Sequence, residues 1–411
     1  MVMQPGISDY AELAGKEAIE ELRRLAGPLE GLSFLHVNST REGGGVAELL
    51  RRLVPLLGEL GLEARWEVIE GTPLFFRTTK GLHNALQGAE VELSPEMLEE
   101  YRRVNRENAE RLDLEADAVV IHDPQPAALI DYRPSGRSRS RWLWRCHIDL
   151  SRPNQEAWDF LRSYVERYDL AIFSSPEFIR WPSAPLLIAI IPPSIDPLGE
   201  KNRELTQEEV ERVYSELGIP RDKPVLLQVS RFDRFKDPLG VIRLWRLVRE
   251  EHGRDCRLVL AGGMATDDPE GEEVLRRVRE EAAGEPDIHI LPRPPAQQLT
   301  DLEVNALQRG ADVVLQKSLR EGFALTVTEA LWKGKPVVAT PTGGIKLQVI
   351  DGVTGCLASS TEEAASKVAW LLEHPDRARK LGEAGREHVR RNFLITRHLR
   401  DYLKLLSAIF S

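Results

Sequence analysis

The feature that most constrains the fold is a repeated alternation of short, nearly continuous apolar runs with amphipathic helical segments. Strands that are apolar on both faces need helices on both sides, so this alternation is typical of parallel βαβ units. In the first half of the chain we expect strands at 32–39, 117–123, 140–149, 170–175 and 186–196. In the second half we expect them at 224–233, 256–263, 287–294, 311–318 and 336–344. The sequence therefore predicts an α/β protein.

Chain length and one irregular segment predict two domains. A chain of 411 residues is too long for a single hydrophobic core. Residues 192–210, "PPSIDPLGEKNRELTQEEV", interrupt the rhythm of strands and helices with prolines and a glycine. We expect one domain at 1–205 and another at 206–394, with a C-terminal helix at about 395–411 that could pack back onto the first. Two doubly wound, Rossmann-like domains would face each other across a cleft and bind ligands at the carboxyl ends of their strands.

Composition excludes several classes of protein. The formal net charge of −10 argues against a nucleic-acid surface, which needs a basic field. Cys146, Cys256 and Cys356 are too widely spaced for a disulfide framework or a metal site, which indicates reduced thiols in a cytoplasmic protein. The N-terminal segment is charged and helical, without an export signal. No apolar run approaches the ~18 residues of a membrane-spanning helix.

Two segments could bind an anion. Gly43, Gly44 and Gly45 lie between an expected strand and an amphipathic helix, where backbone N–H groups can approach a ligand closely. They lack the dinucleotide-binding spacing, and a tight turn alone would also explain them. Arg231 and Lys236 follow the strand at 224–233, where a guanidinium and an ammonium could hold a diphosphate without metal. The alternative is an exposed loop with solvated charges.

The segment "REGFALTVTEA" at 320–330 runs from a loop into a helix and carries Glu321 and Glu329. The backbone N–H groups at the helix start favour an anion. Glu321 would lie in the loop beside that anion, and Glu329, deeper on the helix, could accept hydrogen bonds from ribose hydroxyls. The alternative is that this segment is an ordinary helix whose glutamates lie on the surface and bind no ligand. The glycine turn of "PTGGIKLQVIDGVTG" at 341–355 would back the same pocket.

Histidines and acids in the first half are the remaining candidates. His36 fits a buried position on a strand, whereas His122 and His147 fit either the core or the cleft, since each precedes a carboxylate near a strand end. The acids of residues 113–117 read as a solvated loop, and we expect no metal site. We find no nucleophile elbow. The candidate acceptor-binding residues are Asn38, Asp123, His147 and Asp149.

The sequence "EGFALTVTE" resembles the E-x7-E motif of retaining glycosyltransferases with the GT-B fold, the family-four group that includes sucrose and glycogen synthase relatives. The resemblance implies that Arg231 and Lys236 bind the diphosphate, Glu321 the donor sugar and Glu329 the ribose. It also places His147 beside the transferred sugar and matches the glycine triplet to a glycine loop. The implied catalytic residues are Glu321, His147, Arg231 and Lys236. The implied donor-binding residues are Gly44, Gly45, Arg231, Lys236, Glu321, Gly322, Phe323, Ala324, Leu325, Thr326 and Glu329.

A closer resemblance covers almost the whole chain. "HVNSTREGGGVAELLRRLVPLL", "VVIHDPQPAALI", "WRCHIDLSRPN" and "VSRFDRFKDPLGVI" are similar to the trehalose glycosyltransferring synthases of archaea and thermophilic bacteria. This implies reversible, retaining, metal-independent transfer of glucose from UDP-, ADP- or GDP-glucose to free glucose, giving α,α-trehalose. No cofactor is implied, the partners are these small molecules, and a homodimer is possible. Ala324 stands where the wider family often has glycine, and its methyl is obstructive only if φ is positive.

Two other functions remain open. A trehalose phosphorylase, or another glucosyltransferase related to sucrose and glycogen synthases, would use the same fold. In a phosphorylase, inorganic phosphate replaces the nucleotide, and Glu329 would have no ribose to bind. A non-catalytic sensor of sugar nucleotides would bind the same ligands without turnover.

Overall fold

The computed structural model describes residues 4–42, 44–134, 139–179, 185–263, 269–293 and 299–410, and only the backbone of residues 269, 270 and 293. The chain divides into two compact units, Met1–Ser194 with Ile395–Ser411, and Ile195–Leu394. Each unit contains one six-stranded sheet in which all pairs of strands are parallel. The predicted α/β fold with two doubly wound parallel sheets is therefore confirmed.

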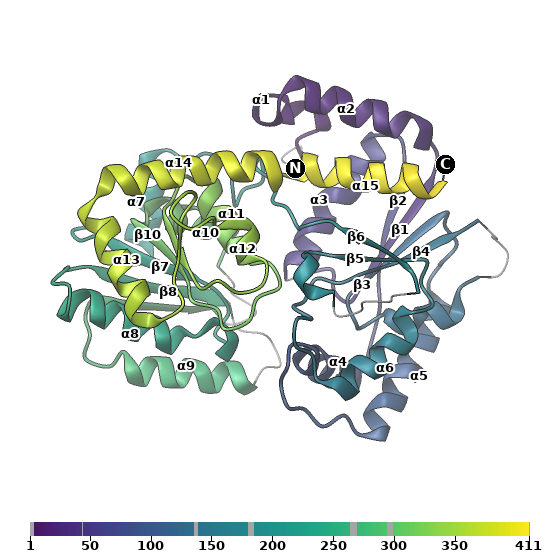
Figure 1. The fold of residues 1–411 in the computed structure, drawn as a ribbon, viewed down its shortest axis with the longest axis horizontal. Coiled ribbons are helices and arrows are strands. Elements are labelled where there is room, and N and C mark those ends of the chain that lie inside the picture. Colours follow the sequence, from purple (N-terminus) through teal and green to yellow (C-terminus); the bar gives the residue numbers. More distant parts are fainter. Residues whose placement is uncertain are drawn as a thin grey trace. The chain divides into compact units, whose positions relative to one another are not determined.

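The first unit has a sheet with the strand order β2-β1-β3-β4-β5-β6 (Figure 1). Its strands are β1 (Ser33–Asn38), β2 (Glu63–Val68), β3 (Ala118–His122), β4 (Arg141–Arg145), β5 (Leu170–Phe173) and β6 (Leu187–Ile190). Its helices are α1 (Ala11–Ala14), α2 (Lys16–Ala26), α3 (Gly45–Glu59), α4 (Pro73–Leu86), α5 (Pro95–Arg111), α6 (Gln155–Val165) and α15 (Ile395–Phe410), with short 3-10 turns between them. Helices α4, α5 and α6 pack together, and α15 packs on α2 and α3.

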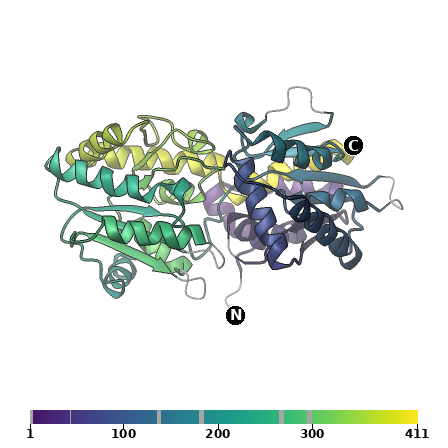
Figure 2. The same cartoon turned by 90° about the horizontal axis from the view of Figure 1, so that it is seen from below.

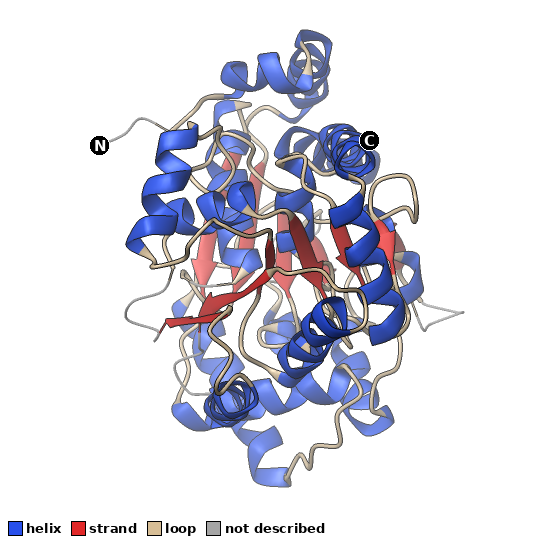
Figure 3. Cartoon of the chain, turned by 90° about the vertical axis from the view of Figure 1, so that its left-hand side faces the viewer, coloured by secondary structure: helices blue, strands red, loops and turns tan. Residues whose placement is uncertain are grey.

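The second unit has a sheet with the strand order β12-β11-β10-β7-β8-β9. Its strands are β7 (Val225–Val229), β8 (Arg257–Gly263), β9 (Ile288–Arg293), β10 (Val313–Gln316), β11 (Val337–Ala339) and β12 (Cys356–Leu357). Its helices are α7 (Gln207–Glu216), α8 (Pro238–Glu250), α9 (Pro269–Glu281), α10 (Asp301–Gly310), α11 (Leu325–Trp332), α12 (Ile345–Gln348), α13 (Thr361–Glu373) and α14 (Pro375–Asn392). Helices α8, α9 and α13 form one layer, and α10, α11 and α14 belong to the other. Figures 2 and 3 show strands with helices on both sides.

The strand order places a topological switch point in each sheet. In the first unit the chain leaves β1 toward β2 on one side and later adds β3 on the other. In the second unit β8 and β9 lie on one side of β7, and β10 lies on the other. Loops that leave neighbouring strands in opposite directions open a crevice at the carboxyl ends, where open α/β sheets bind ligands. Ligand-binding residues are therefore expected in the loops after β1 and β3, and in those after β7 and β10.

Among the described residues, strands β2 and β12 were not predicted. β2 lies at the edge of its sheet, and its residues are exposed or half-buried, so it lacks the continuous apolar run that signals a central strand. β12 has only two residues. Several predicted strands are shorter in the structure than in the prediction. The residues that follow them form loops at the carboxyl edge of the sheet. Residue 294, the last of one predicted strand, lies outside the described residues.

The boundary between the units lies at Ser194, not at residue 205. The segment that follows belongs to the second unit because its polar groups bond there. Asn202 O accepts a hydrogen bond from Trp332 Nε1 at 3.2 Å, and Asn202 Oδ1 accepts one from Lys333 Nζ at 3.0 Å. Helix α15 belongs to the first unit, where Lys404 pairs with Glu21 at 2.8 Å.

Candidate active site

The loops after β7 and β10 bring two of the predicted site residues into contact. Lys236 Nζ lies 2.6 Å from Glu321 Oε2, and the two side chains are 17% and 10% exposed. Ser318 Oγ donates to the same carboxylate oxygen at 3.1 Å. Gln228 Nε2, from β7, donates to Lys236 O at 2.9 Å and steadies the loop. Residues 85 positions apart in the sequence thus form an oriented cation–carboxylate pair at the switch point.

Arg231 occupies a different environment from Lys236. It lies just after β7, and its side chain is 63% exposed. It forms an ion pair with Asp233, at 3.4 Å. An exposed pair of this length contributes little to stability, so the guanidinium can rotate toward an anion at small cost. Arg231 therefore remains a predicted diphosphate ligand.

Helix α11 begins at the predicted anion site, and its start is strained. Ala324 is the N-cap with φ 69° and ψ 74°, so the methyl lies in the left-handed region that costs about 1–2 kcal/mol for an L-residue. No side chain caps this helix. Its first intrahelical bonds reach Ala324 O from Val327 and Thr328, which leaves the N–H groups of Leu325 and Thr326 without partners inside the helix. The loop of Gly322 and Phe323 leads directly into this start.

Gln348, which the sequence analysis did not identify, holds this turn. Its Nε2 donates to Phe323 O, and Thr328 Oγ1 donates to its Oε1 at 2.6 Å, which fixes the orientation of the amide. All three groups are buried. The hydrogen bonds offset part of the strain at Ala324.

The glycine turn before α12 supports the same loop from behind. A Cβ at Gly343, whose φ is 51°, would lie 1.6 Å from Glu321 O. A Cβ at Gly344 would lie 2.7 Å from Gly322 O. The two backbones therefore approach as closely as they do only because both positions lack a side chain.

Glu329 is more buried than we expect of a side chain that binds ribose hydroxyls. It is 2% exposed, and Gln308 Nε2 donates to its Oε2 at 3.2 Å. Lys201 Nζ lies 3.9 Å from Oε1, and Asp301 lies 3.6 Å from the same ammonium. Sequence reasoning missed Lys201 because it assigned this residue to the first domain.

In the first unit, the candidate acceptor residues follow β1, β3 and β4. Asn38 is buried and accepts from Trp66 Nε1 at 2.8 Å while donating to Thr40 O at 2.9 Å. Asp149 is buried and accepts from the N–H of Ser151 at 2.8 Å. Asn38 and Asp149 thus already have protein partners.

Asp123 and His147 are directly linked. The backbone N–H of His147 donates to Asp123 Oδ1 at 2.8 Å, and Asp123 itself has a φ of 65°. Burial raises the pKa of Asp123 to about 7, although the bond from His147 opposes the shift. A carboxyl group that changes charge near neutral pH, held in a strained backbone, is typical of functional sites.

His36, His122 and His147 form a continuous chain of rings. His36 Nδ1 lies 3.0 Å from His122 Nε2, and His122 Nδ1 lies 2.9 Å from His147 Nε2. His36 and His122 are buried and His147 is half-buried. Burial lowers the pKa of His36 to about 3 and holds the pKa values of His122 and His147 well below normal. The sequence suggested each histidine separately but not their connection.

The glycine triplet leads into α3. Gly44 is the N-cap with φ 80°, and Gly45 is the first helical residue. Gly43 lies outside the described residues. The positive φ explains a glycine at 44 on conformational grounds alone, and ligand binding there stays a prediction.

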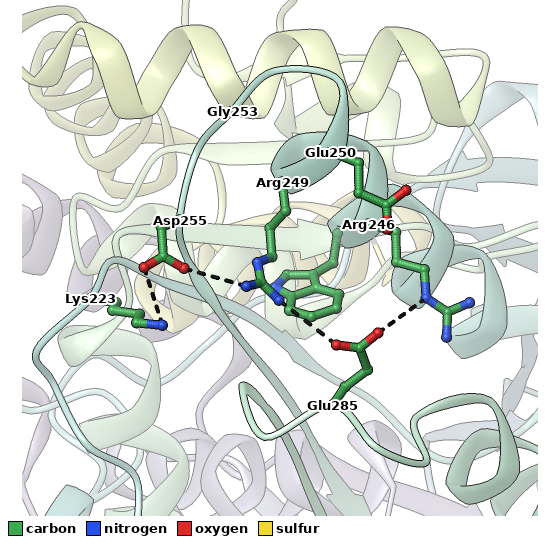
Figure 4. Close-up of a pocket in the computed structure, with 8 residues that line it drawn as sticks. Lys223, Arg246, Arg249, Glu250, Gly253, Asp255 and Glu285 are labelled. Carbon is green, nitrogen blue, oxygen red and sulfur yellow. Dashed lines mark ion pairs between the residues drawn. The ribbon is translucent and has the colours of Figure 1, made fainter.

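A cavity of about 450 Å³ in the second unit lies at the opposite edge of the sheet (Figure 4). Lys223 and Asp255, which line it, precede β7 and β8, so they mark the amino ends of the strands. Arg249 lies 3.7 Å from Asp255 and 3.8 Å from Glu285. Lys223, Arg246 and Arg249 in its wall form ion pairs with Asp255 or Glu285. The cavity lies at the amino edge of the sheet, whereas this fold binds ligands at the carboxyl edge. We assign this cavity to the ion-pair network that covers the amino edge.

Within the described residues, no three His, Cys, Asp or Glu side chains are grouped so that they could hold a metal ion. No helix in the described part of the chain is both long enough and apolar enough to span a membrane.

Comparison with known proteins defines the class. Residues 210–388 match the family "Glycosyl transferases group 1", and residues 36–180 match "Trehalose synthase, N-terminal domain". The fold resembles that of an α,α-trehalose-phosphate synthase (UDP-forming) from Burkholderia xenovorans, solved in complex with glucose-6-phosphate. The two structures match with a TM-score of 0.74 at 14% sequence identity. The match covers 93% of this chain and 100% of the Burkholderia chain. The protein is therefore a glycosyltransferase with the GT-B fold.

The particular family follows from closer relatives. The chain is 48% identical to the trehalose synthase of Pyrococcus horikoshii over 98% of this chain and 96% of that protein. It is 30% identical to the trehalose phosphorylase of Grifola frondosa, but it spans only 58% of that protein's length. The chain belongs to the trehalose synthase family.

Proposed function

We propose that this protein moves glucose from a nucleoside-diphosphate glucose to free glucose and forms α,α-trehalose, with retention at the transferred carbon and without a metal ion. The observation that carries the proposal is the pairing of Lys236 with Glu321 beside the uncapped start of α11. This arrangement places a cation and helix N–H groups for a diphosphate next to a carboxylate for a sugar. We expect the reaction to be reversible, because the nucleotide sugar and trehalose each carry an activated or strained acetal at the transferred carbon.

In this proposal, cationic side chains and the N–H groups at the start of α11 bind the diphosphate. Lys236 has three N–H donors, and its contact with Glu321 occupies one of them, so the others can bind phosphate oxygens. Arg231 swings from its exposed position to add a bidentate contact. The N–H groups of Leu325 and Thr326 add the positive end of α11. Each such donor contributes ~3–4 kcal/mol when charge grows on the leaving group.

Glu321 acts on the sugar. Its carboxylate is oriented by Lys236 and Ser318, which leaves Oε1 to receive sugar hydroxyls and stabilise positive charge at the reacting carbon. The bond from that carbon to the phosphate oxygen breaks, and a bond to the acceptor oxygen forms on the same face. The leaving phosphate oxygen takes the proton of the acceptor hydroxyl. In the first unit, Asp123 and His147 remain the predicted acceptor-binding residues.

A phosphorylase is the second candidate, and one observation favours it. Glu329, the proposed ribose ligand, is 2% exposed and already accepts a bond from Gln308. Binding a ribose requires this carboxylate to exchange a partner, whereas inorganic phosphate makes no such demand. The likeness to a phosphorylase over part of that protein's length points the same way. The identity and coverage of the match to a trehalose synthase favour a synthase over a phosphorylase.

One experiment separates the candidates. The purified chain is incubated with glucose and UDP-, ADP- or GDP-glucose in excess chelator, and both disaccharide and released nucleotide are measured. A non-reducing disaccharide with the α configuration supports the proposal. A reducing product, a need for a phosphorylated acceptor, or activity restored only by magnesium or manganese would overturn it.

Two further arms complete the experiment. Trehalose with inorganic phosphate tests the phosphorylase directly. Lys236→Met, which keeps the apolar stem and removes the charge, is the matched control for turnover. Binding of nucleotide-glucose without any product would assign the chain to the sensors.

A further inference from the structure

The hydrogen bonds among the rings of His36, His122 and His147 restrict which ring nitrogens can carry hydrogen. The contact between His36 Nδ1 and His122 Nε2 is 3.0 Å, and that between His122 Nδ1 and His147 Nε2 is 2.9 Å. Each contact requires one hydrogen between two nitrogens. A neutral imidazole carries a single N–H. Three neutral rings therefore have only two arrangements, in which all carry hydrogen on Nδ1 or all carry it on Nε2.

Surrounding charges and burial keep the rings neutral. His36 is fully buried against the rings of Phe34 and Tyr402, at 4.4 and 5.8 Å between centroids. The guanidinium of Arg145, also fully buried, lowers the pKa of His122 and His147 further, after the larger effect of burial. A charged His122, which could donate in both directions, is thus disfavoured.

The environment of His36, at the buried end of the row of three histidines, favours one of the two arrangements of hydrogen. In the described part of the structure, His36 Nε2 is buried and has no hydrogen-bond partner. With hydrogen on Nε2, the chain would bury an unsatisfied N–H donor. With hydrogen on Nδ1, it leaves only an acceptor lone pair unsatisfied, which proteins tolerate more readily. The Nδ1–H arrangement is the one that this interior favours.

We propose that His36 and His122 are positioning residues that hold His147 in its Nδ1–H form. His147 Nε2 is turned toward His122, so Nδ1 is the nitrogen left to meet a ligand. His147 then presents a hydrogen-bond donor and no lone pair. It binds an oxygen atom of a sugar and cannot remove a proton from the acceptor hydroxyl. This last consequence rests on the proposed function, and it agrees with proton transfer to the leaving phosphate.

The first test needs no substrate. The full chain is labelled with ¹⁵N-histidine, and His147 is assigned among the nine histidines by comparison with His147→Gln. Ring-nitrogen chemical shifts and long-range couplings distinguish a protonated from an unprotonated nitrogen. We expect a protonated Nδ1 and an unprotonated Nε2 at His147 near neutral pH. The opposite pattern would overturn the proposal even in a fully active enzyme.

The second test uses variants of His122. His122→Phe removes both contacts, and we expect Nε2 of His147 to become protonated in a measurable fraction and kcat to fall about tenfold or more. His122→Asn can place an amide N–H where Nδ1 stands, so it should keep the tautomer and restore most of kcat. His289→Phe, a half-buried histidine of the second unit, is the control and should match wild type.

The outcomes separate two kinds of failure. If His122→Phe keeps both the tautomer and kcat, the positioning role is wrong. If His122→Phe does not fold, the wild-type spectrum and the milder His36→Phe variant decide the question. If the protein makes no disaccharide but shows the Nδ1–H form, the proposed function fails and the inference about the histidine chain stands.

Discussion

Replacing Gly343 by alanine tests how tightly the position of Glu321 is determined. The new Cβ would lie 1.6 Å from Glu321 O and 2.8 Å from its carbonyl carbon. Because a Cβ needs more than about 3 Å from such an atom, the loop that carries Glu321 must move by more than an ångström. A misplacement of ~1 Å in a catalytic group can lower the rate about a hundredfold. We therefore expect kcat to fall about a hundredfold or more.

The same substitution also carries two costs in stability. Gly343 has a φ of 51°, where an alanine costs about 1–2 kcal/mol. The contact adds about 1–3 kcal/mol for overpacking. In a unit of this size, each kcal/mol lowers Tm by about 2–4 °C. Calorimetry and steady-state kinetics on the same preparation give both quantities.

Two matched glycines separate strain from displacement. Gly352 has a φ of 72°, and a Cβ there would meet nothing within 4 Å, so Gly352→Ala carries the strain alone. At Gly382, a Cβ would lie 1.9 Å from Gly334 O, so Gly382→Ala carries a backbone clash after the C-terminal end of α11, whereas Glu321 precedes its N-terminal end. We expect both controls to lose stability and to keep kcat within about threefold. If Gly343→Ala has the kcat of either control, the glycine turn does not position Glu321.

The remaining predictions concern charge. Arg231→Ala and Lys236→Ala should each lower turnover about a hundredfold, with little effect on acceptor KM, because charge on the leaving diphosphate grows in the transition state; near-normal kcat in both would mark them as surface charges. Glu321→Gln should lower kcat steeply with little change in donor affinity, whereas Glu329→Gln should weaken donor affinity more than kcat, as measured by calorimetry and saturating rates; the reverse pattern would exchange their roles. Asp123 has a folded pKa of about 7 against 3.8 for the free group, so its contribution to stability is present below about pH 4 and lost as pH rises through 7. Asp123→Asn should therefore flatten the change of Tm across this window, and an unchanged slope would contradict the burial argument.

Sequence patterns identified the elements of the donor site because they are local. The apolar run that becomes β7, followed by Arg231 and Lys236, can be read without knowledge of the fold. The same holds for β10, its loop and α11. Parallel strands end at one edge of a sheet, so the prediction that these segments meet required only the βαβ pattern.

Other features could not be predicted because they join distant residues. The strained φ of Ala324 depends on Gln348, and the burial of Glu329 depends on Gln308 and Lys201. None of these partners has a sequence signal of its own. The same reason explains the boundary at Ser194, because Asn202 of the following segment accepts hydrogen bonds from Trp332 and Lys333 at the C-terminal end of α11.

The sequence by itself determined the class of fold, the two sheets and the residue types at the carboxyl ends of their strands, because apolar periodicity and the order of elements are properties of short segments. Only the tertiary structure decided which of those residues touch. Lys236 meets Glu321 across 85 positions, and His36, His122 and His147 become one hydrogen-bonded chain because β1, β3 and β4 are neighbours in the sheet. Contacts of this kind depend on strand order, burial and backbone conformation together, and no single segment encodes them.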